Sequence, residues 1–324
     1  MGNFIFNLAG LAVGLDCQEP DQRDLIRELW NRLYVMENGI SLSPDLQYLF
    51  KIPGQVIETT SEGAEVISES PHLTVLRSKF LYTLRSGSST LIVDVENGKC
   101  AGVLNEDFWG QPLEHQREYF LLSFLMLLQP KRRYGLHANV IVNDDVGYVI
   151  AGPAGSGKTT LTLGMVRLGW KLLSDDANVL YDTPQGIFAH ALRRGLSCTE
   201  GTLEHFPELS AAADESPNLS DGKKLIDIES LIPESFTPRC MPKVLLFPEI
   251  TSEQTSQLIS IGDTEAMIAL VEQSPGILTY HHLIVKQMGV LNSLLQQTRS
   301  YRMLLGSDLF DSPETVSDLL HSAQ

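Results

Sequence analysis

The sequence predicts an α/β protein with a smaller α+β region over residues 1–130 and a larger α/β domain over residues 131–324. Apolar and polar residues alternate along several short segments of the first region, as in half-buried strands. In the second region, short apolar runs typical of buried strands lead into helix-like segments. The length of 324 residues accommodates two domains with cores of their own.

The first region is expected to open with a strand within Gly2–Leu15 and to continue with an amphipathic helix. The predicted apolar face of that helix consists of Leu25, Ile26, Leu29, Trp30, Leu33 and Tyr34. The later elements expected here are two strand segments, a hairpin turn and a second helix: Leu73–Leu84, Leu91–Leu104 with Asn97-Gly98, and Glu114–Leu128. No catalytic pattern is visible in this region, which we expect to recognise a substrate or partner.

The second region is expected to begin with two strands joined by a polar turn, followed by a helix that stops at Gly169. The predicted elements are, in order, strands His137–Val142 and Gly147–Ala151, a helix to Leu168, strand Leu172-Leu173, a loop over Leu209–Gly222, strand Val244–Phe247, a helix after Thr264, a helix over Leu278–Gln297, strand Tyr301–Leu305 and a terminal helix.

The most specific pattern is Gly-Pro-Ala-Gly-Ser-Gly-Lys-Thr at residues 152–159, which fits the P-loop motif GxxxxGK[ST] at every fixed position. Glycines let backbone N–H groups turn onto phosphate oxygens, and the helix that follows directs its positive end at them. Lys158 would reach the β- and γ-phosphates, and Thr159 would hold Mg²⁺. The motif therefore predicts ATP with Mg²⁺, bound by Gly152, Pro153, Ala154, Gly155, Ser156, Gly157, Lys158, Thr159 and Thr160.

Two adjacent carboxylates, Asp175 and Asp176, follow Lys158 by seventeen and eighteen residues. They end a short strand that we expect beside the P-loop strand, at the sheet edge where ligands bind in open α/β sheets. One carboxylate can hold Mg²⁺ while the other accepts a proton from an attacking hydroxyl. The alternative is a helix N-cap formed by Ser174 and Asp175.

His137 precedes the strand that leads to the P-loop strand, so it can orient or charge-tune Asp175. A single histidine beside an apolar strand can instead be structural. The predicted catalytic residues are therefore Asp175, His137 and Lys158, the last of which comes from the P-loop motif. Thr159 and Asp176 are the predicted metal ligands.

The run from Tyr134 to Leu180 resembles the core of the HPr kinase/phosphorylase family, in which a histidine, a P-loop, a helix and an Asp-Asp pair follow in this order and spacing. The resemblance implies a nucleotide-binding core of the HPr kinase and phosphoenolpyruvate carboxykinase type. It implies phosphotransfer to serine, with Asp175 as the base, Asp176 on the metal and His137 in contact with Asp175. Members form hexamers, so a homo-oligomer is an expectation as well.

Two departures from the family are visible. Ala138 follows the histidine where the family usually has Gly, and the family's downstream Gly-rich signature is replaced by Arg193-Arg194-Gly195-Leu196-Ser197. We therefore expect a relative that retains the kinase core and acts on a different target. Arg193 and Arg194 can clamp phosphates or serve as surface charge, and Lys223 and Lys224 are expected to be surface charge.

Composition excludes several classes of function. The net charge of −16 argues against a nucleic-acid partner, since phosphate contacts need clustered Lys and Arg. The longest apolar run, Tyr119–Leu128, is too short to span a membrane. Four scattered cysteines without metal-ligand spacing are typical of reduced thiols, so we expect a cytoplasmic protein.

Three functions are compatible with these residues. The first is an ATP- and Mg²⁺-dependent kinase acting on a serine hydroxyl of a protein, a peptide or a small molecule. The second is a non-catalytic ATP-binding regulatory protein whose first region contacts a partner. The third, a carboxykinase acting on an oxo-acid, needs substrate-binding arginines and a metal site of His and Lys that the sequence does not offer.

Overall fold

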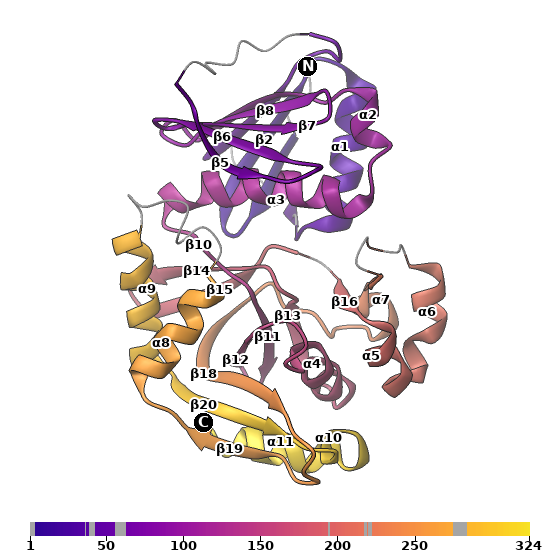
Figure 1. Cartoon of the computed structure of the whole chain (residues 1–324), viewed down its shortest axis with the longest axis vertical. Helices are drawn as coiled ribbons and strands as arrows, with labels where there is room; N and C mark the ends of the chain where they lie inside the picture. The colour runs from indigo at the N-terminus through magenta and orange to yellow at the C-terminus, as the bar shows by residue number, and fades with distance from the viewer. Residues whose placement is uncertain are drawn as a thin grey trace. The chain divides into compact units, whose positions relative to one another are not determined.

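The chain has a mixed α/β fold with several sheets, as predicted, and divides into two compact units, residues 1–133 and 134–324 (Figure 1). The computed structural model describes residues 4–35, 37–38, 43–55, 63–193, 195–216, 219, 222–274 and 284–324.

The first unit is built on a nine-stranded mixed sheet in the order β3-β1-β2-β4-β9-β8-β7-β6-β5. Its strands are β1 (Phe4–Leu8), β2 (Leu11–Cys17), β3 (Glu37–Asn38), β4 (Leu46–Phe50), β5 (Glu65–Glu69), β6 (Thr74–Ser78), β7 (Leu81–Ser86), β8 (Ser89–Asp94) and β9 (Lys99–Val103). β4 lies parallel to β2 and β9, and the other pairs are antiparallel. The predicted hairpin turn at Asn97-Gly98 joins β8 to β9, and Gly98 has a φ of 66°.

Aromatic side chains hold the helices of the first unit to the sheet. These helices are α1 (Pro20–Leu33), α2 (Glu106–Trp109), α3 (Leu113–Leu128) and the 3₁₀ turn η1 (Gln129–Lys131). The indole of Trp30 on α1 lies 5.0 Å from the ring of Tyr48 on β4 and 5.1 Å from Phe124 on α3. Leu25 is 46% exposed, so its assignment to the apolar face was wrong; it lies about 100° from Ile26 around the helix.

The second unit also contains a nine-stranded mixed sheet, in the order β10-β14-β15-β18-β12-β11-β13, to which β20 adds beside β18 and β19 beside β20. Its strands are β10 (Tyr134–Leu136), β11 (Ala138–Asn143), β12 (Val146–Ala151), β13 (Lys171–Ser174), β14 (Asn178–Thr183), β15 (Gly186–Ala191), β18 (Arg239–Ile250), β19 (Gln257–Ser260) and β20 (Arg299–Leu305). β12, β18 and β20 are parallel neighbours. A separate two-stranded sheet pairs β16 (Leu196–Cys198) with β17 (Lys224–Ile226).

The strand order corrects one prediction. β13 was expected next to β12, but β11 lies between them and is antiparallel to both. β11 and β12 form a tight hairpin through Asp144 and Asp145, whose φ angles of 47° and 64° suit a two-residue turn between twisted strands. The carboxyl ends of β12 and β13 therefore meet the amino end of β11 at one edge of the sheet.

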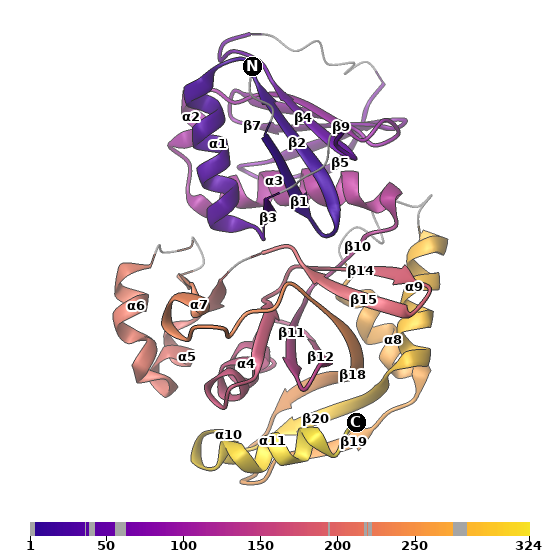
Figure 2. The ribbon, with the colours of Figure 1, turned by 180° about the vertical axis from the view of Figure 1, so that it is seen from behind.

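Helices cover the second unit's sheet, and their bounds are α4 (Lys158–Arg167), α5 (Glu200–His205), α6 (Ser210–Glu215), α7 (Ile228–Leu231), α8 (Asp263–Glu272), α9 (Ile284–Gln297), α10 (Asp308–Asp311) and α11 (Pro313–His321), with the 3₁₀ turn η2 (Pro207–Leu209). One buried cluster joins α4, α10 and α11 to β11, β12, β18 and β20. Figure 2 shows α10 and α11 beside β20. A second cluster joins the other side of α4 to α5, α6 and the β16–β17 pair.

Two predicted segments of this unit, the loop and the helix before β20, differ from the described elements. The loop predicted over Leu209–Gly222 contains the short helix α6, because Ala211, Ala212 and Ala213 favour helix and Ala213 is buried. The predicted start of the helix at Leu278 lies outside the described residues, and α9 is described from Ile284.

All four cysteines are free, and three of them are buried. Within the described stretches of the chain, no helix has both the length and the apolar character needed to cross a bilayer.

Candidate functional site

A glycine-rich loop, residues 152–157, connects the carboxyl end of β12 to the amino end of α4. Gly155 and Gly157 have φ angles of 80° and 98°, in the left-handed region that favours glycine. A Cβ on Gly157 would lie 2.7 Å from Cδ1 of Leu305, whereas a Cβ on Gly155 would meet no atom within 4 Å. Position 157 therefore favours glycine because of its φ angle and because of the nearby Leu305 side chain, whereas position 155 favours glycine because of its φ angle alone.

Lys158, the first residue of α4, is folded over this loop and is only 7% exposed. Its Nζ donates to the carbonyl oxygens of Gly152 at 2.8 Å and Pro153 at 3.3 Å. The hydroxyl oxygen of Ser156 is buried and has no hydrogen-bond partner within the described residues. Ser156 does not line the cavity described below, so this oxygen lies buried inside the loop.

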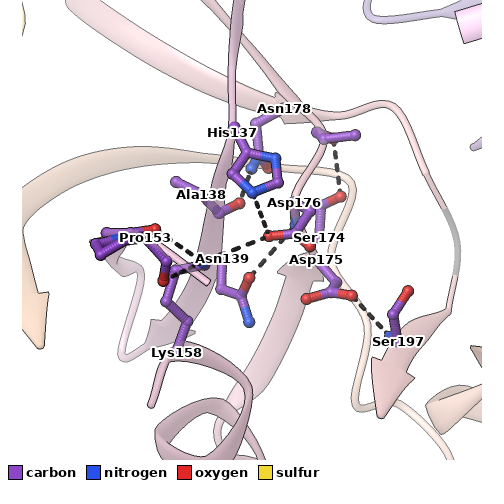
Figure 3. A network of polar contacts seen from close by, with 12 residues as sticks. His137, Ala138, Asn139, Pro153, Lys158, Ser174, Asp175, Asp176, Asn178 and Ser197 are labelled. Carbon is purple, nitrogen blue, oxygen red and sulfur yellow. Dashed lines mark hydrogen bonds and ion pairs between the residues drawn. The ribbon is translucent and has the colours of Figure 1, made fainter. Parts of the chain in front are cut away.

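The two carboxylates after β13 point in different directions. The N–H of Ala177 donates to the carbonyl of Asp175 at 2.8 Å, closing a three-residue turn around Asp176. Asp176 has a φ of 60°, which is uncommon for a residue other than glycine but tolerated by Asp. Figure 3 shows the result: the side chain of Asp176 turns toward His137 and that of Asp175 toward Ser197.

Asp176 is the carboxylate that meets the other predicted side chains. Its Oδ1 lies 3.2 Å from Nε2 of His137 and 3.9 Å from Nζ of Lys158 (Figure 3). The expectation that His137 contacts Asp175 was wrong, because the turn directs the side chain of Asp176, and not that of Asp175, toward His137. Burial lowers the pKa of His137 below its usual 6.5, although the charge of Asp176 opposes the shift. His137 therefore binds a proton less readily than a free imidazole.

Asp175 is fully buried behind the cavity wall. Its Oδ2 accepts a hydrogen bond from the N–H of Ser197 at 2.7 Å, and its Oδ1 has no hydrogen-bond partner among the described residues. Burial, and then the charge of Asp176, raise the pKa of Asp175 to about 6, while Arg193 acts in the opposite direction. Asp175 thus has a higher proton affinity than an ordinary carboxylate.

Arg193 is buried, so of the two alternatives for this residue, surface charge is wrong. Its Nη2 donates to the hydroxyl of Ser197 at 3.1 Å, and it does not line the cavity described below. Arg194 lies outside the described residues. Lys223, expected to be surface charge, lines the cavity.

Sequence reasoning missed Asn139, which is buried inside β11. Its Nδ2 donates to the hydroxyl of Thr162 on α4 at 3.0 Å, and its Oδ1 accepts from the N–H of Asp176 at 3.4 Å. The signal was present in the sequence: Asn139 is the polar interruption of an otherwise apolar strand. It links the helix after the glycine-rich loop to the turn that carries Asp176.

Lys158, His137 and Asp176 border a cavity of about 720 Å³. The loop, the first turn of α4, His137 and Asp176 form one side. The segment after β16 forms a second side, and the ends of β18 and β20 form a third. Asp175 is not one of the lining residues, although Ser197, which binds it, is.

Comparisons with known proteins identify no family for this chain. No protein-family model matches the sequence, and no curated protein matches it. Among solved structures, the Hpr(Ser) kinase/phosphatase from Coxiella burnetii is similar over 58% of this chain and 94% of its own, with 15% sequence identity and a TM-score of 0.30. A likeness at this level does not establish the family or the activity of this chain.

The arrangement suits an anionic ligand. The free N–H groups and positive dipole end of α4 lie beside Lys158. No three His, Cys, Asp or Glu side chains form a metal-binding group in the part of the chain that the structure describes. Mg²⁺ needs no such group, since it usually takes one or two carboxylates together with phosphate oxygens and water. Thr159 and Asp176 both line the cavity and fit this pattern.

Proposed function

We propose that the chain is an ATP- and Mg²⁺-dependent kinase that transfers the γ-phosphoryl group to a serine hydroxyl of a protein, a peptide or a small molecule. The observation that carries the proposal is the meeting of Lys158, Asp176 and His137 beside a glycine-rich loop at one cavity. On this view the second unit is a nucleotide-binding core of the HPr kinase and phosphoenolpyruvate carboxykinase type. The first unit recognises the substrate or a partner.

The loop has the properties of a phosphate cradle. Gly155 and Gly157 have positive φ angles, and both line the cavity. Gly152 to Thr160 would surround the phosphates of ATP, with Lys158 leaving its carbonyl partners to bind the β- and γ-phosphates. Thr159 and Asp176 would hold Mg²⁺, and His137 would fix the orientation of Asp176. When bound, Mg-ATP supplies the phosphoryl group and the leaving group.

Asp175 is the proposed proton acceptor. Its pKa of about 6 makes its carboxylate a stronger base than an exposed one and leaves it ionised at neutral pH. The serine hydroxyl of the substrate would attack the γ-phosphorus and pass its proton to Oδ1, the oxygen without a partner in the described structure. The cavity wall at Ser197 separates Asp175 from the ligand space, so the acceptor would need to approach beside this residue.

The test is phosphotransfer from γ-labelled ATP with Mg²⁺ to free serine, to HPr and to proteins from source-cell lysate. Lys158→Ala, Asp175→Asn and Asp176→Asn are each expected to reduce labelling by about 10²- to 10³-fold. Lys171→Ala is the matched control, because Lys171 is exposed at the far end of β13. Labelling that survives Asp175→Asn but not Asp176→Asn would make Asp176 the base.

A second function, a non-catalytic ATP-binding regulator, is favoured by one observation: Asp175 does not line the cavity. A regulator would bind ATP through the same loop and would need no proton acceptor. The regulator would be supported over the kinase if the wild-type chain binds ATP tightly but transfers no phosphoryl group to any acceptor. The Lys158→Ala variant should then no longer bind ATP.

A further inference from the structure

An exposed aromatic pair forms one wall of the cavity and has no part in the phosphate chemistry. His205, the last residue of α5, stacks on Phe310 of α10, with ring centroids 4.1 Å apart and 22° between the planes. Both residues line the cavity, His205 is exposed and Phe310 is 38% exposed. A stacked pair left open to a cavity offers a flat apolar surface to a ligand.

The apolar character extends beyond the pair. Leu305, Leu309 and Ile250 line the same cavity; Leu305 and Leu309 are buried, and Ile250 is 62% exposed. Apolar side chains that line a cavity form a binding surface for an apolar or aromatic group. The glycine-rich loop and Lys158 provide the polar part of the same cavity, so its ligand should carry both an anionic part and a flat apolar part.

Residues next to the pair pack on α4. Leu309, next to Phe310, packs on α4 at Gly164, where a Cβ would meet Cδ1 of Leu309 at 2.8 Å. Gly164 is six residues after Lys158, which corresponds to about 9 Å of helix rise. Phe206, next to His205, is buried in the cluster that covers the other side of α4. The rings therefore lie alongside the helix whose amino end would hold phosphates.

Hydrogen bonds fix the Phe310 side of the pair in place. Ser256 donates through its N–H and its hydroxyl to the carboxylate of Asp308 at 2.8 and 2.6 Å. The N–H of Ser307 donates to the carbonyl of Glu253 at 3.1 Å. The buried ring of Phe206 also contacts Phe310 edge-on, with centroids 6.4 Å apart. A surface held in this way binds a flat ligand with little loss of conformational entropy.

We infer that His205 and Phe310 form a nucleobase subsite, on which the purine ring of ATP stacks while its phosphates occupy the glycine-rich loop. The inference rests on the proposed function and deepens it, since it states how the same site recognises the base. Stacking is tolerant of base identity, so GTP should bind as well as ATP within a few-fold.

The test compares the affinity of ATP with that of inorganic tripolyphosphate, which has no base, in the full chain with Mg²⁺. Wild type should bind ATP the more tightly. His205→Ala and Phe310→Ala should each weaken ATP binding roughly five- to 100-fold and leave tripolyphosphate binding unchanged. His205→Phe should retain ATP affinity, because it keeps a flat ring at this position.

Phe188→Ala is the matched control. Phe188 also stacks on an aromatic ring, that of Tyr181 at 6.0 Å, but it does not line the cavity. It should leave both affinities unchanged, and urea unfolding checks that each variant is folded. Equal affinity of wild type for the two ligands, or unchanged ATP affinity in both cavity variants, would overturn the subsite.

The same experiment separates the subsite from the kinase. If ATP binds in the predicted base-dependent way but no phosphoryl group is transferred, the subsite stands and the kinase fails. If tripolyphosphate binds as tightly as ATP and transfer from ATP still occurs, the kinase stands and the subsite fails. A wild-type chain that binds neither ligand would overturn both.

Discussion

The imidazole of His137 holds the carboxylate of Asp176, with Nε2 3.2 Å from Oδ1, at the edge of the sheet where the glycine-rich loop begins. The two side chains come from different strands: His137 precedes β11 and Asp176 follows β13. Burial lowers the pKa of His137, and Oδ1 of Asp176 has no hydrogen-bond partner among the described residues, so the two groups lie in contact without a hydrogen bond between them.

His137→Ala should raise the Mg²⁺ concentration required for phosphotransfer. Without the imidazole, Asp176 can rotate away from the metal position, and loss of such a supporting group lowers metal affinity about 10- to 100-fold. The measurement is a Mg²⁺ titration of phosphotransfer at saturating ATP. His137→Gln, whose amide can donate to the carboxylate of Asp176, should recover part of the loss. An unchanged Mg²⁺ requirement in the alanine variant would remove His137 from this role.

The two glycines with positive φ in the loop should respond differently to alanine. Gly155→Ala should lower the free energy of unfolding by about 1–2 kcal/mol, because alanine disfavours the left-handed region. Gly157→Ala should lose roughly 1–3 kcal/mol more, because its Cβ would also collide with Leu305. Urea unfolding without ligand measures both values. Equal losses for the two variants would show that the contact with Leu305 relaxes freely.

The free energy of unfolding should depend on pH through the ionisation of Asp175. Its pKa is raised from 3.8 to about 6, so the folded chain binds this proton more tightly than the unfolded chain. The contribution of Asp175 to stability is therefore largest at low pH and falls as the pH rises from 3.8 through about 6. Asp175→Asn, which cannot ionise, should remove this decline. Unfolding free energies of both proteins at pH 4, 5, 6 and 7 provide the comparison, and parallel pH profiles would contradict it.

Asn139 should couple α4 to the turn at Asp176. Asn139→Ala removes the partner of the Thr162 hydroxyl and of the Asp176 N–H, and should lower the free energy of unfolding by about 1–3 kcal/mol. A double-mutant cycle with Thr162→Val should give a coupling energy of about 0.5–1.5 kcal/mol. Strictly additive effects would show that the hydrogen bond between them contributes nothing.

Local patterns were sufficient to predict the elements around the loop. The strand before Gly152, the helix after Gly157 and its end at Gly169 all follow from residue types within twenty positions of one another. The hairpin of β11 and β12 follows from apolar runs on either side of a polar turn. These features depend on backbone preferences and on burial, which a single stretch of sequence expresses.

The lateral order of strands and the direction of single side chains could not be predicted in this way. Nothing in the sequence near Leu172 shows that β11 would lie between β12 and β13. The φ of Asp176 decides which carboxylate meets His137, and the Asp-Asp pair alone does not reveal it. His205 and Phe310 are more than one hundred residues apart, so their stacking depends on the complete fold.

The contact between Gly157 and Leu305 joins the loop to a residue that the ribosome adds 148 positions later. β20 and the segment through Phe310 also supply one wall of the cavity. A nascent chain that has exposed the loop and α4 therefore lacks this support until nearly the whole second unit has been synthesised. The cavity is complete only when residues through Phe310 are present, and a growing chain that carries only the glycine-rich loop lacks one of its sides.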